Sequence, residues 1–389
     1  HRQTKSVQIV VSPFVGATYY VSSSGGSDAN DGRSEAKPFK TFAQAMVKLE
    51  SLLSVGPSAV RILFKRGDVF PAPGINFANR IGKPAIIGAY GSGPQPVIHA
   101  SAAGKPVFRI RGNSGGFRFV DLEMRGNFDF KTRQGSMETM FQVYAGFKDL
   151  FIHRCTATRC GGPVTVTGGT CSELEDIFIT DNDFHEFYSI GIFAGGRRLV
   201  VIGNSVIKSA WTHLLRVWGT DGAHIAENTL LYPSFETTRG RHALKLHAAN
   251  QATRDAVITD NRFRGSSWPV TIAPQDYWAE AYLENVLFER NTIEGDSLSG
   301  LGVLIVANDV TVRNNLFHRD ATSTKSRFTA ILVPKYEKVS SRKNLDVYNN
   351  TYFDGRDAGF GRFLDVEDAG FKGVRVHNKG GRSSSGRSS

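Results

Sequence analysis

The 389-residue sequence has few cysteines and no long apolar run, and both shortages narrow what the chain can be. Its three cysteines are Cys155, Cys160 and Cys171. Their spacing fits no zinc site, and an odd number does not fit a disulfide-built scaffold, which leaves one disulfide and one free thiol as an open possibility. No stretch approaches the roughly 18 apolar residues of a membrane-spanning helix, so no membrane partner is expected. The first residues, HRQTKSVQIVV, lack a complete signal peptide.

Acidic residues are scarce relative to basic ones. Lysine and arginine total 47 and aspartate and glutamate 36, which gives a formal charge of +11. Five of these positive charges lie near the two ends of the chain, within 1–16 and 379–389, so the body carries about +6. A basic body favours an anionic partner. No recognition motif for nucleic acid accompanies the charge, so nucleic acid is not the expected partner.

Repetition is what the sequence has in abundance. A short alternating strand, a glycine or polar turn and an apolar run ending in asparagine recur over roughly 105–355. We expect Cys155 and Asp121 to take the asparagine position in two earlier units. Repeats of this length built from strands predict a solenoid, whose buried amides bond their own turn and the next amide in the stack. The recurring asparagines are Asn182, Asn204, Asn228, Asn261, Asn291, Asn315 and Asn350.

These repeats and the opening segment YYVSSSGGSDANDGRSEAKPFKTFAQAM resemble the right-handed parallel β-helix family of carbohydrate-active proteins, which includes polysaccharide lyases and uronate epimerases. The resemblance implies an all-β fold with one parallel β-helix domain over 17–378. An extended lead-in at 1–16 precedes it and a flexible tail at 379–389 follows. The resemblance also implies export, to the cell exterior or the periplasm.

A helix is expected ahead of the repeats. Thr41 is a capping residue, and apolar residues share one face over 42–53. Such a helix would cover the open end of the solenoid, where apolar surface and strand edges would otherwise meet water. The residues of the apolar face are Phe42, Ala45, Met46 and Leu49.

The loop before this helix is rich in oxygen donors from Asp28, Asn30 and Asp31. Oxygen ligands suit calcium, but turns built from the same residue types explain the composition equally well. We therefore expect no cofactor, with calcium at this loop as the alternative.

Alternation along the strands sends every second side chain to the outer surface. In the segment ALKLH the leucines point inward, so Lys245 and His247 point outward. In LLRVW the outward pair is Arg216 and Trp218. Coils stack about 4.8 Å apart, so side chains of successive coils form columns. One expected column is Gly191, Arg216, Lys245 and Thr271, and a second is Phe193, Trp218 and His247.

This stacking predicts one cluster of titratable side chains over three neighbouring coils. An outward lysine such as Lys245 is, taken singly, more often a solvated surface residue, so the convergence is what indicates a site. The candidate catalytic residues are Lys245, His242, Arg216, His213, Tyr188 and Arg241. The candidate substrate-binding residues are Trp218, His247, Tyr144, Gln142, Phe193, Tyr277, Trp278 and His185.

The cluster suits β-elimination from a uronate sugar, because that reaction needs a neutralised carboxylate, a base and an acid. Arg216 or Arg241 can pair with the carboxylate, and Lys245 or His242 can act as the base. Tyr188 or His213 can act as the acid. Lyases and epimerases of the resembling family often use calcium as the neutraliser, but no acidic cluster is expected on this face, so a metal-independent site is favoured.

A polysaccharide lyase acting as a monomer on an acidic polysaccharide is therefore the function we expect. A glycoside hydrolase needs two or three carboxylates on the same face, and related polygalacturonases carry paired aspartates and a Gly-His-Gly segment that this sequence lacks. A uronan C5-epimerase and a non-catalytic polysaccharide-binding module or adhesin also stay open. The available acids all fall in expected turns or loops and are Asp221, Asp276, Glu236 and Glu280.

Overall fold

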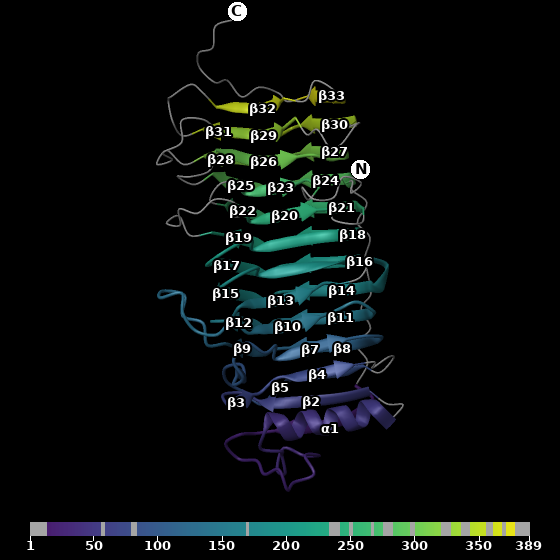
Figure 1. Ribbon diagram of the computed structural model, residues 1–389, viewed down its shortest axis with the longest axis vertical. Coiled ribbons are helices and arrows are strands. Elements are labelled where there is room, and N and C mark those ends of the chain that lie inside the picture. The colour runs from purple at the N-terminus through teal and green to yellow at the C-terminus, as the bar shows by residue number, and fades with distance from the viewer. Residues whose placement is uncertain are drawn as a thin grey trace, which may run out of the picture.

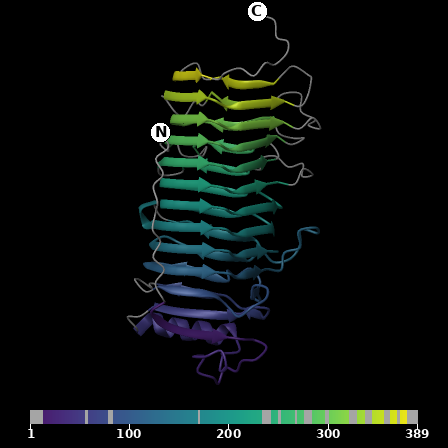
Figure 2. The same cartoon turned by 180° about the vertical axis from the view of Figure 1, so that it is seen from behind.

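The strands of the protein stack into one tall coil. The computed structural model describes residues 14–55, 59–78, 84–168, 171–232, 242–248, 252–265, 268–274, 283–295, 300–319, 328–335, 343–354, 361–367 and 371–377. Strands of successive coils pair in parallel and form three faces, here named A, B and C in the order in which the chain visits them. Figure 1 and Figure 2 show the strands in columns along the long axis.

Face A carries the candidate site. It contains β4 (Ile75–Ala78), β7 (Phe108–Arg111), β10 (Thr139–Val143), β13 (Gly162–Val166), the first halves of β16 (Ile192–Ile202) and β18 (Leu215–Ala226), β20 (Leu244–His247), β23 (Val270–Ile272), β26 (Leu301–Ile305), β29 (Thr329–Val333) and β32 (Arg362–Val366).

Face B follows face A in each coil, and a short 3-10 helix, Cys171–Glu173, precedes one of its strands. It contains β1 (Gly16–Val21), β2 (Ala59–Lys65), β5 (Ala85–Tyr90), β8 (Ser114–Val120), β11 (Phe147–His153), β14 (Leu174–Thr180), the second halves of β16 and β18, β21 (Thr253–Thr259), β24 (Leu283–Glu289), β27 (Asn308–Arg313), β30 (Lys343–Tyr348) and β33 (Lys372–His377).

Face C closes each coil before the chain returns to face A. It contains β3 (Val69–Ala72), β6 (Val97–Ala100), β9 (Glu123–Arg125), β12 (Thr156–Thr158), β15 (Asp183–Phe187), β17 (Ser205–Ser209), β19 (Thr229–Leu231), β22 (Arg262–Gly265), β25 (Thr292–Gly295), β28 (Leu316–Arg319) and β31 (Thr351–Asp354).

The seven recurring asparagines form a buried ladder at the bend between faces B and C, as the repeat predicts. In the first six, the amide nitrogen donates to the amide oxygen of the next coil at 2.8–3.1 Å and to a backbone carbonyl. Asn182 Nδ2, for example, donates to Ile152 O at 3.0 Å. The backbone N–H groups of the same six also donate to the amide oxygen of the next coil. Asn350 ends the ladder, and its amide nitrogen donates to Val312 O at 2.9 Å. The ladder therefore satisfies polar groups that burial would otherwise leave unpaired.

One early unit departs from the expected pattern. Cys155 does take the asparagine position, and its N–H donates to Asn182 Oδ1 at 2.9 Å. The residue in that position one coil earlier is Leu122, not Asp121, because Thr156 pairs with Glu123. Asp121 lies one residue earlier with φ 59° and forms an ion pair with Arg154 at 2.8 Å. The inward position takes an apolar or amide side chain because a carboxylate there would be buried without a cation.

The helix expected at 42–53 is present as α1 (Phe42–Val55), and Gln44 N donates to the capping Thr41 Oγ1 at 3.1 Å. Phe42, Ala45, Met46 and Leu49 are all buried. Figure 1 shows α1 below β2, across the first coil. The helix thus covers the open end of the solenoid and continues its core.

That core consists of inward side chains from all three faces. Phenylalanines stack on one another along the first coils, with Phe108 lying 4.7 Å from Phe119 and 5.8 Å from Phe141 between ring centroids. Cys155 and Cys160 are buried, free thiols, so neither forms the disulfide left open by the sequence. The lead-in at 1–13 and the end at 378–389 lie outside the described residues.

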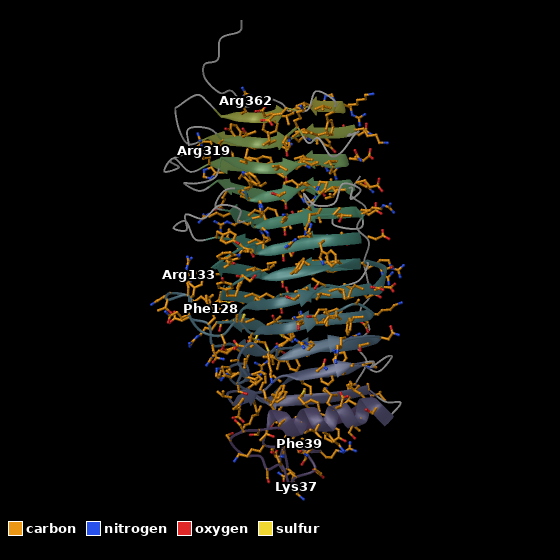
Figure 3. The ribbon with its side chains drawn as sticks, in the orientation of Figure 1. Lys37, Phe39, Phe128, Arg133, Arg319 and Arg362 are labelled. Atoms are coloured by element: carbon orange, nitrogen blue, oxygen red, sulfur yellow. The ribbon has the colours of Figure 1, made fainter. Side chains whose placement is uncertain are left out.

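An inserted loop, 126–138, projects beside face A between β9 and β10, where Figure 3 labels Phe128 and Arg133. The carboxylate of the buried Glu138 accepts hydrogen bonds from Gly104 N and Asn127 N, which ties the loop to the solenoid. Residues 233–241, 275–282 and 320–327 lie outside the described part of the chain.

Candidate active site

Register on face A brings Arg216 and Lys245 together. Arg216 pairs with Lys245 and Lys245 with Thr271, and Trp218 pairs with His247. These neighbours match the expected columns. Since paired strands lie about 4.8 Å apart, the charged and aromatic side chains of β18 and β20 share one surface.

Two positions of the expected columns are wrong. Phe193 lies beside Arg216 rather than Trp218, because Ile192 pairs with Leu215. A bulge between Ala194 and Gly196 shifts the register only after this point. Gly191 points into the solenoid. A Cβ at Gly191 would lie 2.4 Å from Val206 Cγ1, so only a glycine fits there. The residue that precedes Arg216 in its column is therefore the aromatic Phe193.

His213 and His242 stack on each other at the turn that leads into face A. Their ring centroids are 4.9 Å apart, and only 9% and 4% of their surfaces are exposed. His242 Nδ1 contacts Trp268 O at 2.8 Å and Thr271 Oγ1 at 3.1 Å. A carbonyl only accepts, so Nδ1 carries the proton and Nε2 the lone pair. His213 Nδ1 is buried and has no hydrogen-bond partner among the described residues.

Arg216 is held in place by its neighbours. Its Nε donates to His247 Nε2 at 2.9 Å, and its guanidinium lies 4.8 Å from the centroid of the Phe193 ring. Arginine remains a cation, so His247 accepts this bond through a lone pair and is neutral. The Trp218 ring packs against Phe193 with centroids 6.1 Å apart. These contacts orient the guanidinium on face A.

Burial keeps all three histidines uncharged at neutral pH. It lowers the pKa of His213 to about 2, that of His247 to about 3 and that of His242 to about 4. The positive charges of Arg216 and Lys245 contribute to each of these lowered pKa values, after burial. Burial also lowers the pKa of Arg216. The site therefore combines fixed cations with neutral imidazoles.

Two exposed tryptophans flank the histidine pair, and the sequence reasoning missed both. Trp211 is 60% exposed and stacks on Tyr188 with centroids 5.9 Å apart, and Tyr188 meets the edge of the buried Phe128 at 5.5 Å. Trp268 is 42% exposed and packs against His242. The available signal was proximity, because Trp211 stands two residues before His213 in the segment WTH. Exposed aromatic faces are suited to stacking on apolar faces of sugar rings.

The remaining candidates fall in different places. Gln142 lies on β10 of face A and Tyr144 comes directly after that strand, three coils before Arg216. His185 lies on face C, where Asp183 is 3.6 Å away and raises its pKa, so it is separate from the cluster. Arg241, Tyr277 and Trp278 lie outside the described residues.

Carboxylates do not gather at this site in the part of the chain that the structure describes. The positions paired with or adjacent to Arg216 in register hold Phe193, Trp218, Lys245 and His247. Asp221, one of the acids considered for hydrolysis, lies on face B between Arg197 and Arg254. Asp276, Glu236 and Glu280 lie outside the described ranges.

In the loop considered for calcium, side-chain oxygens accept hydrogen bonds from groups of the chain itself. Asp28 accepts hydrogen bonds from the backbone N–H groups of Lys40 and Thr41 and from Thr41 Oγ1, all at 2.9 Å. Asn30 Nδ2 donates to Pro38 O at 2.8 Å. Turn and cap formation thus explains this composition. Across the described ranges, no three His, Cys, Asp or Glu side chains are grouped as metal ligands would be.

Comparison with known proteins identifies the fold. No protein-family profile matches the chain, and no curated protein matches it in sequence. The GH136 lacto-N-biosidase from Eubacterium ramulus superposes with a TM-score of 0.62 at 13% identity, covering 93% of this chain and 68% of that one. The chain is a right-handed parallel β-helix, as its repeats predict.

Two further solved structures are similar more distantly. The A-module of the mannuronan C-5 epimerase AlgE6 from Azotobacter vinelandii has a TM-score of 0.45 at 11% identity, with 87% of this chain and 95% of that one covered. The DFA-IIIase from Arthrobacter chlorophenolicus A6 has a TM-score of 0.41 at 15% identity, with 81% and 70% covered. Within the described residues no helix has the length and apolar character to cross a membrane.

Proposed function

We propose that the protein is a polysaccharide lyase that cleaves a uronate-containing acidic polysaccharide by β-elimination. The observation that carries this proposal is the cluster on face A: Arg216 is held by His247 and pairs in register with Lys245. The neutral His213 and His242 stack beside it. Such a cluster offers fixed positive charge together with uncharged groups that can take up or pass on a proton.

Arg216 is proposed to neutralise the uronate carboxylate. β-Elimination breaks the C5–H and C4–O bonds and forms a C4–C5 double bond. The C5 proton becomes acidic once the adjacent carboxylate is paired with a cation. A guanidinium pairs with both carboxylate oxygens at once, which suits this role. Arg241 is the alternative neutraliser.

The base that removes the C5 proton is proposed to be His242 or Lys245. The lone pair of His242 lies on Nε2, and its low pKa makes it a weak base that is already neutral at pH 7. A lysine among cations is a stronger base once it loses its proton. Tyr188 would then protonate the departing O4 oxygen, because His213, the other candidate acid, is neutral at pH 7 and carries no imidazolium proton to donate. Loss of activity only below about pH 5 favours His242, whereas loss below neutral pH favours Lys245.

The proposed activity also bears on the cellular location and the oligomeric state of the enzyme. Acidic polysaccharides are found outside the cytoplasm, so we propose that the protein is secreted or periplasmic. We also propose that it acts as a monomer, because face A of a single chain holds the cluster. Light scattering at working concentration tests the second statement.

The test is a substrate panel of alginate, pectate, glycosaminoglycans and bacterial exopolysaccharides. A lyase generates an unsaturated product that absorbs in the ultraviolet, and the absorbance should rise on one of these polymers. New reducing ends without that absorbance would indicate a hydrolase instead.

A second assay separates the lyase from an epimerase and from a binding module. A C5-epimerase would exchange the C5 hydrogen with deuterated water without shortening the chain. A binding module would retard the polymer in a gel without either change. Any of these outcomes in the absence of an unsaturated product would overturn the proposed lyase activity.

A further inference from the structure

Face A carries a second group of cations at a distance from the cluster. On β7, Arg109 and Arg111 alternate with the buried Phe108 and Ile110, so both arginines point outward. Gln142 pairs with Arg109, and Arg109 Nε donates to Gln142 Oε1 at 2.9 Å. Tyr144, which is 37% exposed, follows one coil above Arg111, since its N–H donates to Ile110 O.

Arg109 and Arg111 differ in their ion pairing from several other arginines on the solenoid. On face B of the same coil, Arg118 is paired with Asp149 at 2.7 Å. Arg154, which follows β11 in the next coil, is paired with Asp121 at 2.8 Å. Within the described residues, neither Arg109 nor Arg111 has a carboxylate within ion-pair distance. No carboxylate of the described residues neutralises their charge, which suits them to pair with an external anion.

Register connects this group to the catalytic cluster. The column runs from Arg109 through Gln142, Thr165 and Phe193 to Arg216. Four coil steps of about 4.8 Å separate the two arginines, or roughly 19 Å along the axis. The intervening side chains are uncharged, so one extended anionic chain can follow the column without meeting a negative charge.

The opposite direction along face A is less suited to an anion. Beyond Thr271 the column continues with Leu304, Leu332 and Asp365. Aliphatic side chains and a carboxylate offer an acidic polymer no charge partner. The column is therefore directional, with its cationic part toward the N-terminal end of the solenoid.

We propose that Arg109, Arg111, Gln142 and Tyr144 form a distal subsite for the acidic polysaccharide, which lies along face A from β18 toward β7. This inference rests on the proposed function for the identity of the polymer. The two arginines pair with carboxylates of the chain, Gln142 orients Arg109, and the Tyr144 ring stacks on a sugar. The enzyme thus favours polymers over short oligosaccharides, which cannot span the distance from Arg216 to Arg109.

The first experiment measures binding independently of activity. The full-length protein is run through native gels that contain alginate, pectate or hyaluronan, and through gels with neutral dextran. The double variant R109Q/R111Q should lose most of the retardation that the wild type shows in at least one acidic gel, with no change in dextran. The control R118Q removes the same type of charge from face B of the same coil and should behave like the wild type.

The second experiment uses the polymer that the panel identifies. R109Q/R111Q should raise KM for the polymer about tenfold, with kcat unchanged and with unchanged kcat/KM on oligosaccharides shorter than the span. Thermal unfolding of each variant checks that the fold is retained.

Three results would overturn the subsite: equal retardation of R109Q/R111Q and wild type, an equal loss in R118Q, or no retardation of the wild type in any acidic gel. Failure of the lyase proposal looks different. The wild type would then form no unsaturated product, while the gels would still report whether the arginines bind the polymer.

Discussion

Two stacks of buried polar side chains run through this solenoid, and they differ in how their hydrogen bonds are satisfied. At the bend between faces B and C, each ladder amide is bonded to the amide of a neighbouring coil and to backbone groups. At the turn between faces C and A, His213 stacks on His242 but keeps an unpartnered Nδ1 among the described residues. A stack of buried polar side chains therefore does not by itself indicate a functional site. A satisfied stack holds the coils together, whereas the histidine stack lies beside the cations Arg216 and Lys245 and leaves a buried ring nitrogen without a partner among the described residues.

The largest expected effect is on activity at the histidine stack. His242→Ala and Lys245→Ala should each reduce kcat by at least about a hundredfold, because each removes a candidate proton acceptor. Circular dichroism should show an intact fold. The control is His224→Ala, which removes an exposed histidine from face B and should leave turnover unchanged. Normal turnover in both site variants would mean that the cluster on face A is not the active site.

The next effect is on stability at the ladder. Asn228→Ala removes the group that accepts from Asn204 Nδ2 and donates to Val201 O and Asn261 Oδ1, leaving buried polar atoms unpaired. The free energy of unfolding should fall by about 3 kcal/mol in urea titrations. Asn285→Gly, at an exposed asparagine with φ 55°, should change it by less than about 0.5 kcal/mol. A similar loss in both variants would refute the special role of the ladder.

A third prediction uses pH to compare the two stacks. The pKa of His242 is about 4 in the folded protein, below the usual 6.5, so the unfolded chain takes up protons first as pH falls. Above pH 6.5 the titration of His242 does not affect the free energy of unfolding. Below pH 6.5, protonation of this residue in the unfolded chain lowers the free energy of unfolding progressively. Between pH 6.5 and pH 5 the loss should reach about 2 kcal/mol for this residue. His242→Gln should flatten that part of the stability curve, whereas Asn228→Ala should only lower it. An unchanged slope in His242→Gln would contradict the burial argument.

The smallest effect is expected at Trp211, an exposed aromatic residue beside the histidine pair. Trp211 is 60% exposed and contributes little to the core, so Trp211→Ala should leave unfolding nearly unchanged. Its loss should raise KM for the polysaccharide about fivefold, since an aromatic contact contributes about 1 kcal/mol. Phe353→Ala, at a ring 53% exposed on face C, is the control and should not alter KM. An equal change in both variants would show that Trp211 has no specific role.

Much of the fold follows from local patterns. The asparagine spacing predicts the ladder, Thr41 and the apolar positions after it predict α1, and alternation predicts which side of β20 carries Lys245. Part of the site follows too, because Arg216, Lys245 and Thr271 occupy equivalent places in their repeats. The errors at Gly191, Phe193 and Asp121 come from differences in register, by two residues at Phe193↔Arg216 and by one residue at Asp121, and alternation within a strand does not determine the register between strands.

The sequence by itself determined the periodicity, since amides, glycines and alternating apolar residues act within a few positions of their own unit. Only the tertiary structure decided which side chains meet across coils. Phe193 beneath Arg216, the bond from Arg216 to His247 and the exposure of Trp211 all depend on register between segments more than twenty residues apart. Turn length and bulges set that register, and a slip of one residue would reverse which side chains point into the core and which point outward.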